Sequence, residues 1–326
     1  MKIRPLTNAA ISAALSIVLP GAAFGQAAYP SKPIHFIVPF PPGGGTDIVS
    51  RALTQNISKA TGWTFVVDNK PGAGGNIGAE AAAKSPPDGY TLVMGQTSNL
   101  AINPFLYAKP PFNPLKDFAP VALVTSVPLV IVASGKSKYR KMADVVAGAK
   151  TAPDRITYAS PGSGTVGHLA GELIARSAGI KLIHVPYKGA SPALTDLLGG
   201  QVDLYLSTPQ AAAGHIKSNA IHALAVTSAK RETALPQVPT LAEAGFAGLE
   251  ITNWYGVLAP AKTPPAIVSQ LNAAIVKALK EPELREALSR EGGEVLGGTP
   301  AQFAELLKSE QVKWAKVVRD SGAKVD

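Results

Sequence analysis

A glycine-rich loop between an apolar run and a helical pattern constrains this chain most. Residues 34–38 are expected to form a strand, residues 39–47 the loop, and residues 48–60 carry apolar side chains at helical spacing. Thr46 or Asp47 is the expected N-cap of that helix. The first amides of a helix lack intrahelical partners and lie at the positive end of its dipole, so this loop is suited to a small anion. A plain tight turn explains the same stretch equally well.

A second strand, loop and helix follow further along the chain. Residues 155–159 are expected to form a strand, Gly162–Gly167 reads Gly-x-Gly-x-x-Gly, and His168 lies in the first turn of the helix. A dinucleotide site would need an acidic residue at the end of the next strand, but that strand ends near Tyr187 without one. The motif therefore indicates a second helix start facing an anion. The loop at 39–47 is not a P-loop either, because no Gly-Lys-Ser/Thr follows at the required spacing.

Strands alternate with helices through most of the predicted chain, which is typical of parallel β-α-β units. Ligands of such sheets bind beyond the carboxyl ends of the strands. Three polar loops, at 39–47, 68–76 and 95–99, follow successive expected strands. All three therefore lie at the same end of one sheet, and their convergence is more informative than any one of them.

Two apolar stretches divide the chain into lobes. The stretch within 118–132 is expected to cross from one lobe to the other, and the stretch at 251–259 to return. We therefore assign residues 28–126 and 250–326 to lobe 1, and residues 127–249 to lobe 2.

Capping signals place several helix starts. Ser191-Pro192 and Ser207-Thr208-Pro209 each combine a capping side chain with a proline at the first helical position, and residues 299–302 form a capping box. The region after residue 264 is expected to contain helices alone and to cover the sheet of lobe 1.

The N-terminus has the pattern of a secretory signal peptide, assigned to residues 1–27. Lys2 and Arg4 precede a short apolar run at 9–19, and a small-x-small cleavage site stands at 25–27. We therefore expect an exported, periplasmic protein. The absence of cysteine excludes disulfides, thiol catalysis and a lipid-modified N-terminal Cys.

The chain is basic, with a formal net charge of +9. Its basic residues are scattered and form no arginine-rich tract, so nucleic acid is not an expected partner. A small acidic ligand or an anionic membrane surface fits this charge better.

Several polar and aromatic residues near the loops have a structural reading beside a functional one. His168 could contact a ligand or pack beside its loop, and Lys188 could be a counter-charge or a solvated lysine. Asp47 could bind a ligand amine or cap its own helix, while three aromatic residues, Tyr187, Trp254 and Tyr255, could line a cleft or belong to a core. The histidines show no metal spacing and there is no Gly-x-Ser-x-Gly elbow. No metal, cofactor or catalytic residue is predicted.

A series of motifs in fixed order resembles one family. The motifs are Val-Pro-Phe-Pro-Pro-Gly-Gly-Gly-Thr-Asp (38–47), Asp-Asn-Lys-Pro-Gly-Ala-Gly-Gly-Asn-Ile-Gly (68–78), Pro-Pro-Asp-Gly-Tyr-Thr-Leu (86–92), Ser-Pro-Gly-Ser-Gly-Thr (160–165), Val-Pro-Tyr-Lys-Gly (185–189) and Leu-Leu-Gly-Gly-Gln-Val-Asp-Leu (197–204). With this series the chain resembles the Bug family, the periplasmic solute-binding receptors of tripartite tricarboxylate transporters. The resemblance covers essentially the whole chain after the signal peptide.

The resemblance implies an α/β fold of the type II periplasmic binding protein kind, with two lobes, a mostly parallel sheet in each, and two crossover strands as the hinge. It implies a small carboxylate in the cleft, delivery to a large and a small membrane subunit, and no cofactor. We expect a monomer. The loops at 38–47 and 160–165 would hold the carboxylate groups. The full set of candidate ligand-binding residues is Phe40, Gly44, Gly45, Thr46, Asp47, Ser98, Asn99, Ser160, Gly162, Ser163, Gly164, Thr165, His168, Tyr187, Lys188 and Ser207.

Two other functions use the same cleft. An exported enzyme acting on a carboxylic acid would turn its ligand over, and a sensor would report the closed form to a membrane kinase. Turnover assays distinguish the enzyme from a receptor, and identification of membrane partners distinguishes the sensor.

Overall fold

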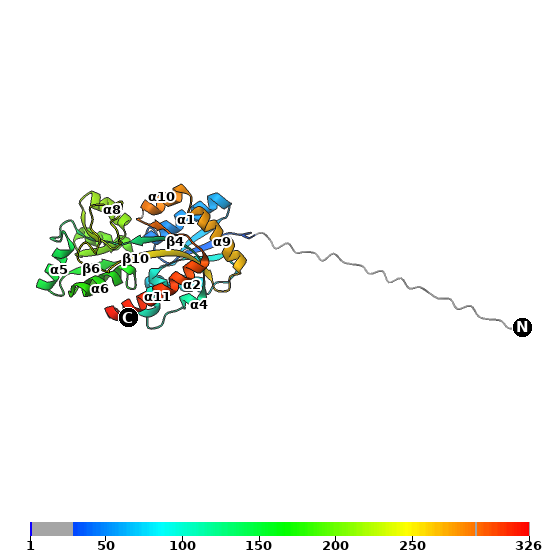
Figure 1. Ribbon diagram of the computed structural model, residues 1–326, viewed down its shortest axis with the longest axis horizontal. Coiled ribbons are helices and arrows are strands. Elements are labelled where there is room, and N and C mark those ends of the chain that lie inside the picture. The colour runs from blue at the N-terminus through cyan, green and yellow to red at the C-terminus, as the bar shows by residue number, and fades with distance from the viewer. Residues whose placement is uncertain (2–28, 291, 326) are drawn as a thin grey trace.

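The chain forms two lobes side by side in the computed structural model, which describes residues 1, 29–290 and 292–325 (Figure 1). Apart from Met1, the expected signal peptide therefore lies outside the described residues. None of the described helices has the length and apolar character needed to cross a membrane.

The first lobe is built on a six-stranded sheet in the order β11-β4-β10-β3-β1-β2. Its strands are β1 (Ile34–Val38), β2 (Phe65–Asn69), β3 (Thr91–Gln96), β4 (Phe118–Pro128), β10 (Thr252–Pro260) and β11 (Glu294–Val295). Its helices are α1 (Gly45–Thr61), the 3₁₀ turn η1 (Ala73–Gly75), α2 (Asn76–Ala83), the π-helical η2 (Ser98–Ile102), α3 (Asn103–Leu106), α4 (Pro114–Asp117), α9 (Pro265–Ala278), α10 (Pro282–Arg290) and α11 (Pro300–Ser321).

The second lobe is built on a five-stranded sheet in the order β7-β6-β8-β5-β9. Its strands are β5 (Val130–Ser134), β6 (Thr157–Ser160), β7 (Ile183–Pro186), β8 (Leu204–Ser207) and β9 (Ile221–Val226). Its helices are α5 (Met142–Thr151), α6 (Val166–Ala178), α7 (Ala190–Gly199) and α8 (Pro209–Lys217).

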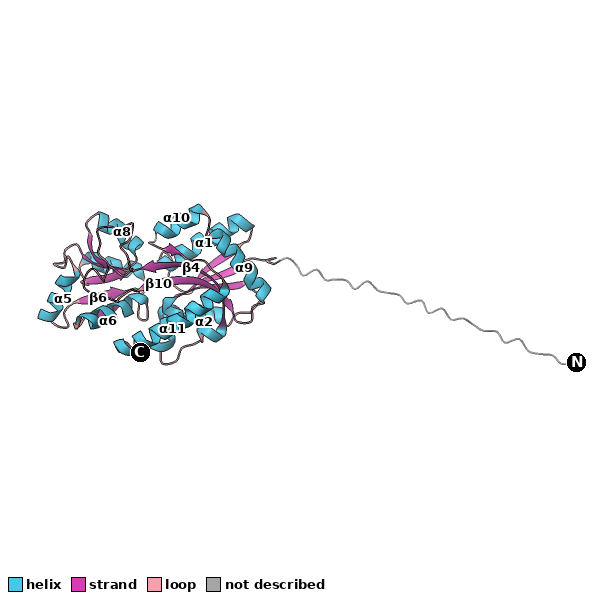
Figure 2. Cartoon of the chain, viewed as in Figure 1, coloured by secondary structure: helices cyan, strands magenta, loops and turns pink. Residues whose placement is uncertain are grey.

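Most strands of each sheet run in one direction, and the strands nearest the lobe junction run against their neighbours. β1 pairs with β2 and β3 in parallel, whereas β10 pairs antiparallel with β3 and β4. In the second sheet β6 pairs in parallel with β7 and β8, and β5 pairs antiparallel with β8 and β9. This confirms the predicted α/β class with two lobes and mostly parallel sheets (Figure 2).

Two segments join the lobes. Leu129 links β4 of the first sheet directly to β5 of the second, and the stretch between β9 and β10 returns the chain to the first sheet. At this junction Thr227 Oγ1 donates to the Ile251 carbonyl and accepts from the Leu129 N–H, so the two segments are tied to each other.

The C-terminal helix α11 connects the cores of both lobes. Trp314, fully buried on α11, belongs to an apolar cluster that contains Leu100 of the first lobe and Leu169 of the second. The indole N–H groups of Trp254 and Trp314 donate to the same oxygen of Glu310, at 3.0 and 2.9 Å. These contacts anchor α11 to β10.

Several predicted helix starts are confirmed. Thr299 and Gln302 form the reciprocal capping box of α11, and Thr208 caps α8 with Pro209 at its first position. Two others were predicted wrongly. The N-cap of α1 is Gly44, not Thr46 or Asp47, and α7 begins at Ala190 instead of Pro192.

The C-terminal region also contains a strand that the sequence analysis did not expect. β11 has only two residues, Glu294 and Val295, which is too short for any alternation to be visible. It pairs with β4, where Thr125 Oγ1 donates to the Glu294 carbonyl at 2.8 Å.

A core substitution on α11 should weaken the whole fold. Phe303 is fully buried and packs edge to face on Trp254, with ring centroids 5.7 Å apart. Phe303→Ala should lower the free energy of unfolding in urea by about 3–5 kcal/mol, because it removes a ring and leaves a cavity. Phe105→Ala, at a phenylalanine that is 43% exposed on α3, is the matched control and should cost far less. Equal losses in the two variants would contradict the packing described here.

Candidate functional site

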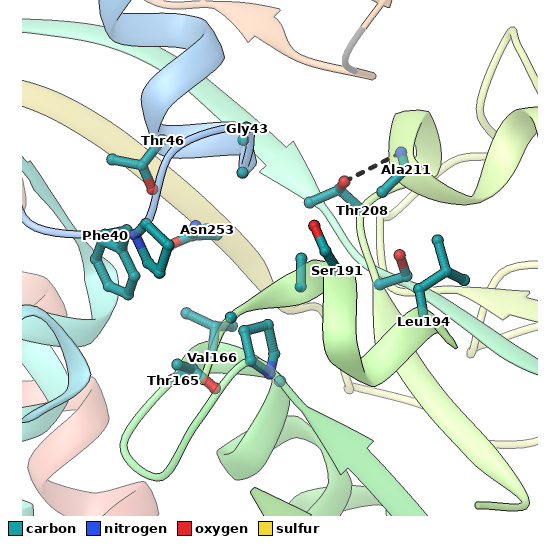
Figure 3. A pocket seen from close by; sticks show the side chains of 18 of the residues that line it. Phe40, Gly43, Thr46, Thr165, Val166, Ser191, Leu194, Thr208, Ala211 and Asn253 are labelled. Atoms are coloured by element: carbon teal, nitrogen blue, oxygen red, sulfur yellow. Dashed lines mark hydrogen bonds between the residues drawn. The ribbon is translucent and has the colours of Figure 1, made fainter. Parts of the chain in front are cut away.

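A cavity of about 520 Å³ lies between the two lobes. Lobe 1 contributes the loop before α1, the end of β3 and the start of β10, and lobe 2 contributes the first residues of α6, α7 and α8. The lining residues with polar or aromatic side chains are Phe40, Thr46, Gln96, Ser98, Thr165, Lys188, Ser191, Tyr205, Ser207, Thr208, Asn253 and Tyr255. Figure 3 shows side chains from both lobes around this cavity.

Four helix N-termini meet at the cavity. Thr165 Oγ1 accepts the N–H of His168 at the start of α6, and Thr208 Oγ1 accepts the N–H of Ala211 at the start of α8. The N-caps of α1 and α7 are Gly44 and Gly189, which have no side chain to cap the first turn. Free amides at the positive ends of α1 and α7 therefore face the same cavity as the capped ends of α6 and α8.

The charge of the cavity lining is positive. Among the described residues, Lys188 is the single charged side chain of the lining, and none of the described Asp or Glu residues belongs to it. Together with the helix dipoles, this makes the cavity favourable for an anion and unfavourable for a cation.

The loop before α1 is held by Asp47 from behind. The Asp47 carboxylate accepts from Arg51 Nε at 2.9 Å, from Asn69 Nδ2 at 3.0 Å and from the Gly43 N–H at 3.0 Å. Burial opposes ionisation of Asp47, but the hydrogen bonds from Arg51, Gly43 and Asn69 outweigh it and lower its pKa. Asn69 Nδ2 also donates to the Phe40 carbonyl at 3.0 Å, so the ionised carboxylate shapes the loop without facing the ligand space.

The loop before α6 rests on two stacked histidines. The rings of His168 and His184 lie 4.0 Å apart at 13°. His168 Nδ1 accepts the Gly164 N–H at 3.2 Å, and His184 Nε2 lies 2.7 Å from Ser160 Oγ. The two imidazoles therefore fix both ends of the loop that carries Thr165.

Both histidines are held neutral by their surroundings. Burial lowers the pKa of His168 to about 4, and burial together with the neighbouring His168 lowers that of His184 to about 3. Tyr158 stacks on His184 at 4.9 Å and directs its hydroxyl to Glu172 Oε1 at 2.6 Å.

The two lobes also touch at the cavity. Ser98 Oγ accepts the N–H of Val166 at 3.3 Å. Gly164 has φ +78°, and a Cβ there would run into the Asn103 side chain from lobe 1. The glycine at 164 is thus required by the backbone conformation and by the close approach of the other lobe.

The structure separates the sequence-based candidates into two groups. Those that line the cavity are Phe40, Gly44, Gly45, Thr46, Ser98, Thr165, Lys188 and Ser207. Those that do not line it are Asp47, Asn99, Ser160, Gly162, Ser163, Gly164, His168 and Tyr187. Asn99 is occupied by the Gln96 N–H and the Gly75 carbonyl, and Tyr187 directs its hydroxyl to Asp196 at 2.6 Å.

Several lining residues were missed by the sequence analysis. Gln96 was inside a loop expected to face the ligand but was not singled out, and Asn253 lies in a strand that was assigned only a crossing function. Ser191 and Thr208 were assigned to helix caps, and both also line the cavity. The one signal for Asn253 was its amide within an otherwise mostly apolar strand.

No group of three or more acidic or histidine side chains in the described part of the chain is arranged to hold a metal ion. The fold and cavity define a two-lobed solute-binding protein whose ligand lies between the lobes.

Residues 49–323 match the family described as the tripartite tricarboxylate transporter family receptor. Protein BugT of Bordetella pertussis is 40% identical over 298 residues, covering 91% of each chain. The structure of the periplasmic binding protein BugD is similar with a TM-score of 0.85 and 36% identity, covering 91% of this chain and 99% of that one. R. palustris Rpa4515 with adipate has a TM-score of 0.87 and 34% identity, covering 91% of this chain and all of the other.

The chain therefore belongs to the receptor family of the tripartite tricarboxylate transporters, as its resemblance to the Bug family predicted. It is a periplasmic-type solute-binding receptor for carboxylates.

The histidine stack should make stability depend on pH. Both pKa values are lower in the folded chain than the ordinary value of about 6.5, so below that pH the unfolded chain binds more protons. Stability should fall as the pH drops from about 6.5 towards 4, with a slope of about 1.4 kcal/mol per pH unit for each histidine.

Replacing either histidine should reduce the dependence of stability on pH. His184→Gln and His168→Asn should each remove about half of the histidine contribution in urea unfolding curves measured between pH 4.5 and 7.5. The unmodified protein is the reference for the full slope. A slope that is the same in both variants and in the unmodified protein would show that the stack does not titrate in this way.

Proposed function

We propose that this chain is an exported receptor that captures a small carboxylate between its lobes and delivers it to the large and small membrane subunits of a tripartite tricarboxylate transporter. One observation carries the proposal: four helix N-termini and Lys188 meet at a cavity to whose lining the described part of the chain contributes no carboxylate. Family membership supports the class of ligand and the transporter. The ligand is a di- or tricarboxylate, or an aromatic or amino acid, held as an anion.

The helix dipoles alone do not provide enough binding energy. A helix end contributes about 0.3–1 kcal/mol to an exposed anion and up to about 2 kcal/mol when partly buried. Micromolar binding requires about 8 kcal/mol. Hydrogen bonds must provide much of the difference, from the free amides of α1 and α7 and from hydroxyls such as those of Thr46 and Ser191.

Closure of the lobes adds the remaining contacts. Because both lobes line the cavity, a bound anion touches both at once and stabilises the closed arrangement over an open one. In this proposal lobe 1 comprises residues 28–126 and 250–326, lobe 2 comprises residues 127–249, and the connections at Leu129 and Ile251 act as the hinge. The protein acts in the periplasm as a monomer.

A hydrolase reading of the same site has one observation in its favour, the 2.7 Å distance between Ser160 Oγ and His184 Nε2. Ser160, however, is completely buried and does not line the cavity, and its hydroxyl also lies 3.0 Å from the Gly162 carbonyl. A nucleophile must reach its substrate, so this pair supports the loop and the receptor function stands.

Carboxylate binding should raise the melting temperature of the protein expressed without residues 1–27. A screen of small carboxylates against their neutral amides, followed by thermal unfolding, measures this directly. Ligand at about 100 times its Kd should stabilise the native state by about 2.7 kcal/mol. Stabilisation by an acid and not by its amide is the expected result. Equal stabilisation by both, or product formation from the bound acid, would refute the receptor proposal.

Thr46 should contribute directly to affinity. It lies in the first turn of α1 and is 4% exposed, and within the described residues its hydroxyl has no hydrogen-bond partner. Thr46→Val keeps the shape and removes the hydroxyl, so affinity for the carboxylate found in the screen should fall about 10- to 100-fold, the cost of a hydrogen bond to a charged group.

Ser163→Ala is the matched control for Thr46→Val. Ser163 lies in the loop before α6 but does not line the cavity. Titration calorimetry should give its Kd within about threefold of the unmodified protein. A loss of affinity in Ser163→Ala with none in Thr46→Val would place the anion elsewhere.

A further inference from the structure

Two primary amides lie together at the cavity, one from each of two neighbouring strands. Gln96 ends β3 and Asn253 lies near the start of β10, and these strands pair antiparallel at Tyr255 and Gln96. Asn253 Nδ2 donates to Gln96 Oε1 at 2.7 Å. Both residues line the cavity and both are buried, with 4% of Gln96 and 8% of Asn253 exposed. Figure 3 shows the Asn253 side chain among the other lining side chains.

Two of the four polar side-chain atoms of this pair have no hydrogen-bond partner among the described residues. Asn253 Oδ1 is a buried acceptor without a partner among the described residues. The hydrogen bonds of the described chain leave Gln96 Nε2 without an acceptor as well. An unpaired buried polar group of this kind is unfavourable, so a group from the ligand gains by meeting it.

The pair thus offers one unpaired acceptor atom, Asn253 Oδ1, and one unpaired donor group, the Gln96 N–H₂. If both amide ends are exchanged, Gln96 donates to Asn253 and the pair still offers one acceptor and one donor. A hydroxyl group matches this pair, because it donates one hydrogen bond and accepts others.

Other common substituents of a small acid match the pair less well. A methylene group leaves both amides unpaired. An ammonium group can donate to an acceptor, but it cannot accept from the amide N–H₂ that it faces. It also shares the cavity with Lys188, and no Asp or Glu of the described residues lines the cavity to balance its charge. A carboxylate would repel the amide oxygen of the pair.

We infer that Gln96 and Asn253 select a carboxylate that bears a hydroxyl group, over the unsubstituted and the amino acid of the same chain length. This inference rests on the proposed carboxylate site. The helix N-termini hold the carboxylate groups of the ligand, and the amide pair forms hydrogen bonds with the substituent that lies between those groups. Asn253 stands on β10, the strand by which the chain returns to lobe 1, so the substituent is read at the lobe junction.

Two sets of acids that differ at a single substituent test the selectivity. Malate, succinate and aspartate form one set, and 2-hydroxyglutarate, glutarate and glutamate form the other. Titration calorimetry on the protein without residues 1–27 should give at least one set in which the hydroxy acid binds about tenfold or more tighter than the other two, as expected for one satisfied pair of buried groups.

Two variants test whether this pair is responsible. Gln96→Met and Asn253→Leu remove one amide each at similar side-chain length. Each should reduce the preference for the hydroxy acid to less than about threefold, with the affinity for the unsubstituted acid changed little. Gln201→Met, at an exposed glutamine outside the cavity, is the matched control and should keep the full preference. Melting temperatures of the ligand-free variants show that each is folded.

The outcomes separate this inference from the proposed function. Carboxylates that bind with no preference for the hydroxyl, a preference for the amino acid, or a hydroxyl preference that survives in both variants would overturn the inference and leave the carboxylate receptor intact. No binding of any of the six acids would overturn the inference, while the wider screen against neutral amides still decides the function. Loss of the preference in both variants and its retention in Gln201→Met would establish it.

Discussion

The positive ends of four helices determine how the rest of this protein is arranged. Free helix amides attract an anion only when no nearby carboxylate competes for them. The chain contains many acidic residues, and none of those that the structure describes lines the cavity. Asp47, the acidic residue in the first turn of α1, is turned away and held by Arg51 and Asn69. Facing the cavity, the Asp47 carboxylate would repel an anionic ligand. In its actual position it holds the loop before α1, which lines the cavity.

In the second lobe, two uncharged histidines likewise hold a loop that lines the cavity. The stacked imidazoles of His168 and His184 support the loop before α6, and burial keeps both uncharged near neutral pH. Charged imidazoles would repel each other at this distance and would withdraw the acceptor that the Gly164 N–H uses. The shape of the anion-binding loop therefore depends on two groups that never touch the ligand space.

The sequence predicted the larger features of the fold because they rest on local signals. Glycine-rich loops after apolar runs located α1 and α6, and capping residues located the starts of α8 and α11. Side-chain direction could not be predicted in the same way. Asp47, His168 and Tyr187 lie within loops or turns that do border the cavity, yet their side chains are occupied by Arg51, Gly164 and Asp196. Asn253 was missed for the opposite reason, since its importance depends on the pairing of β10 with β3 at a separation of 157 residues.

Because α11 packs against both lobes, the stability of one lobe depends on the other. Trp314 and Phe303 complete the apolar cluster to which both lobes contribute, and Arg176 of α6 donates to the Asp320 carbonyl at the far end of the helix. Loss of α11 from its place would remove two large aromatic side chains from this cluster, and both lobes would lose packing at the same time. The two lobes are therefore coupled in stability, and we expect them to unfold in one cooperative transition and not one after the other.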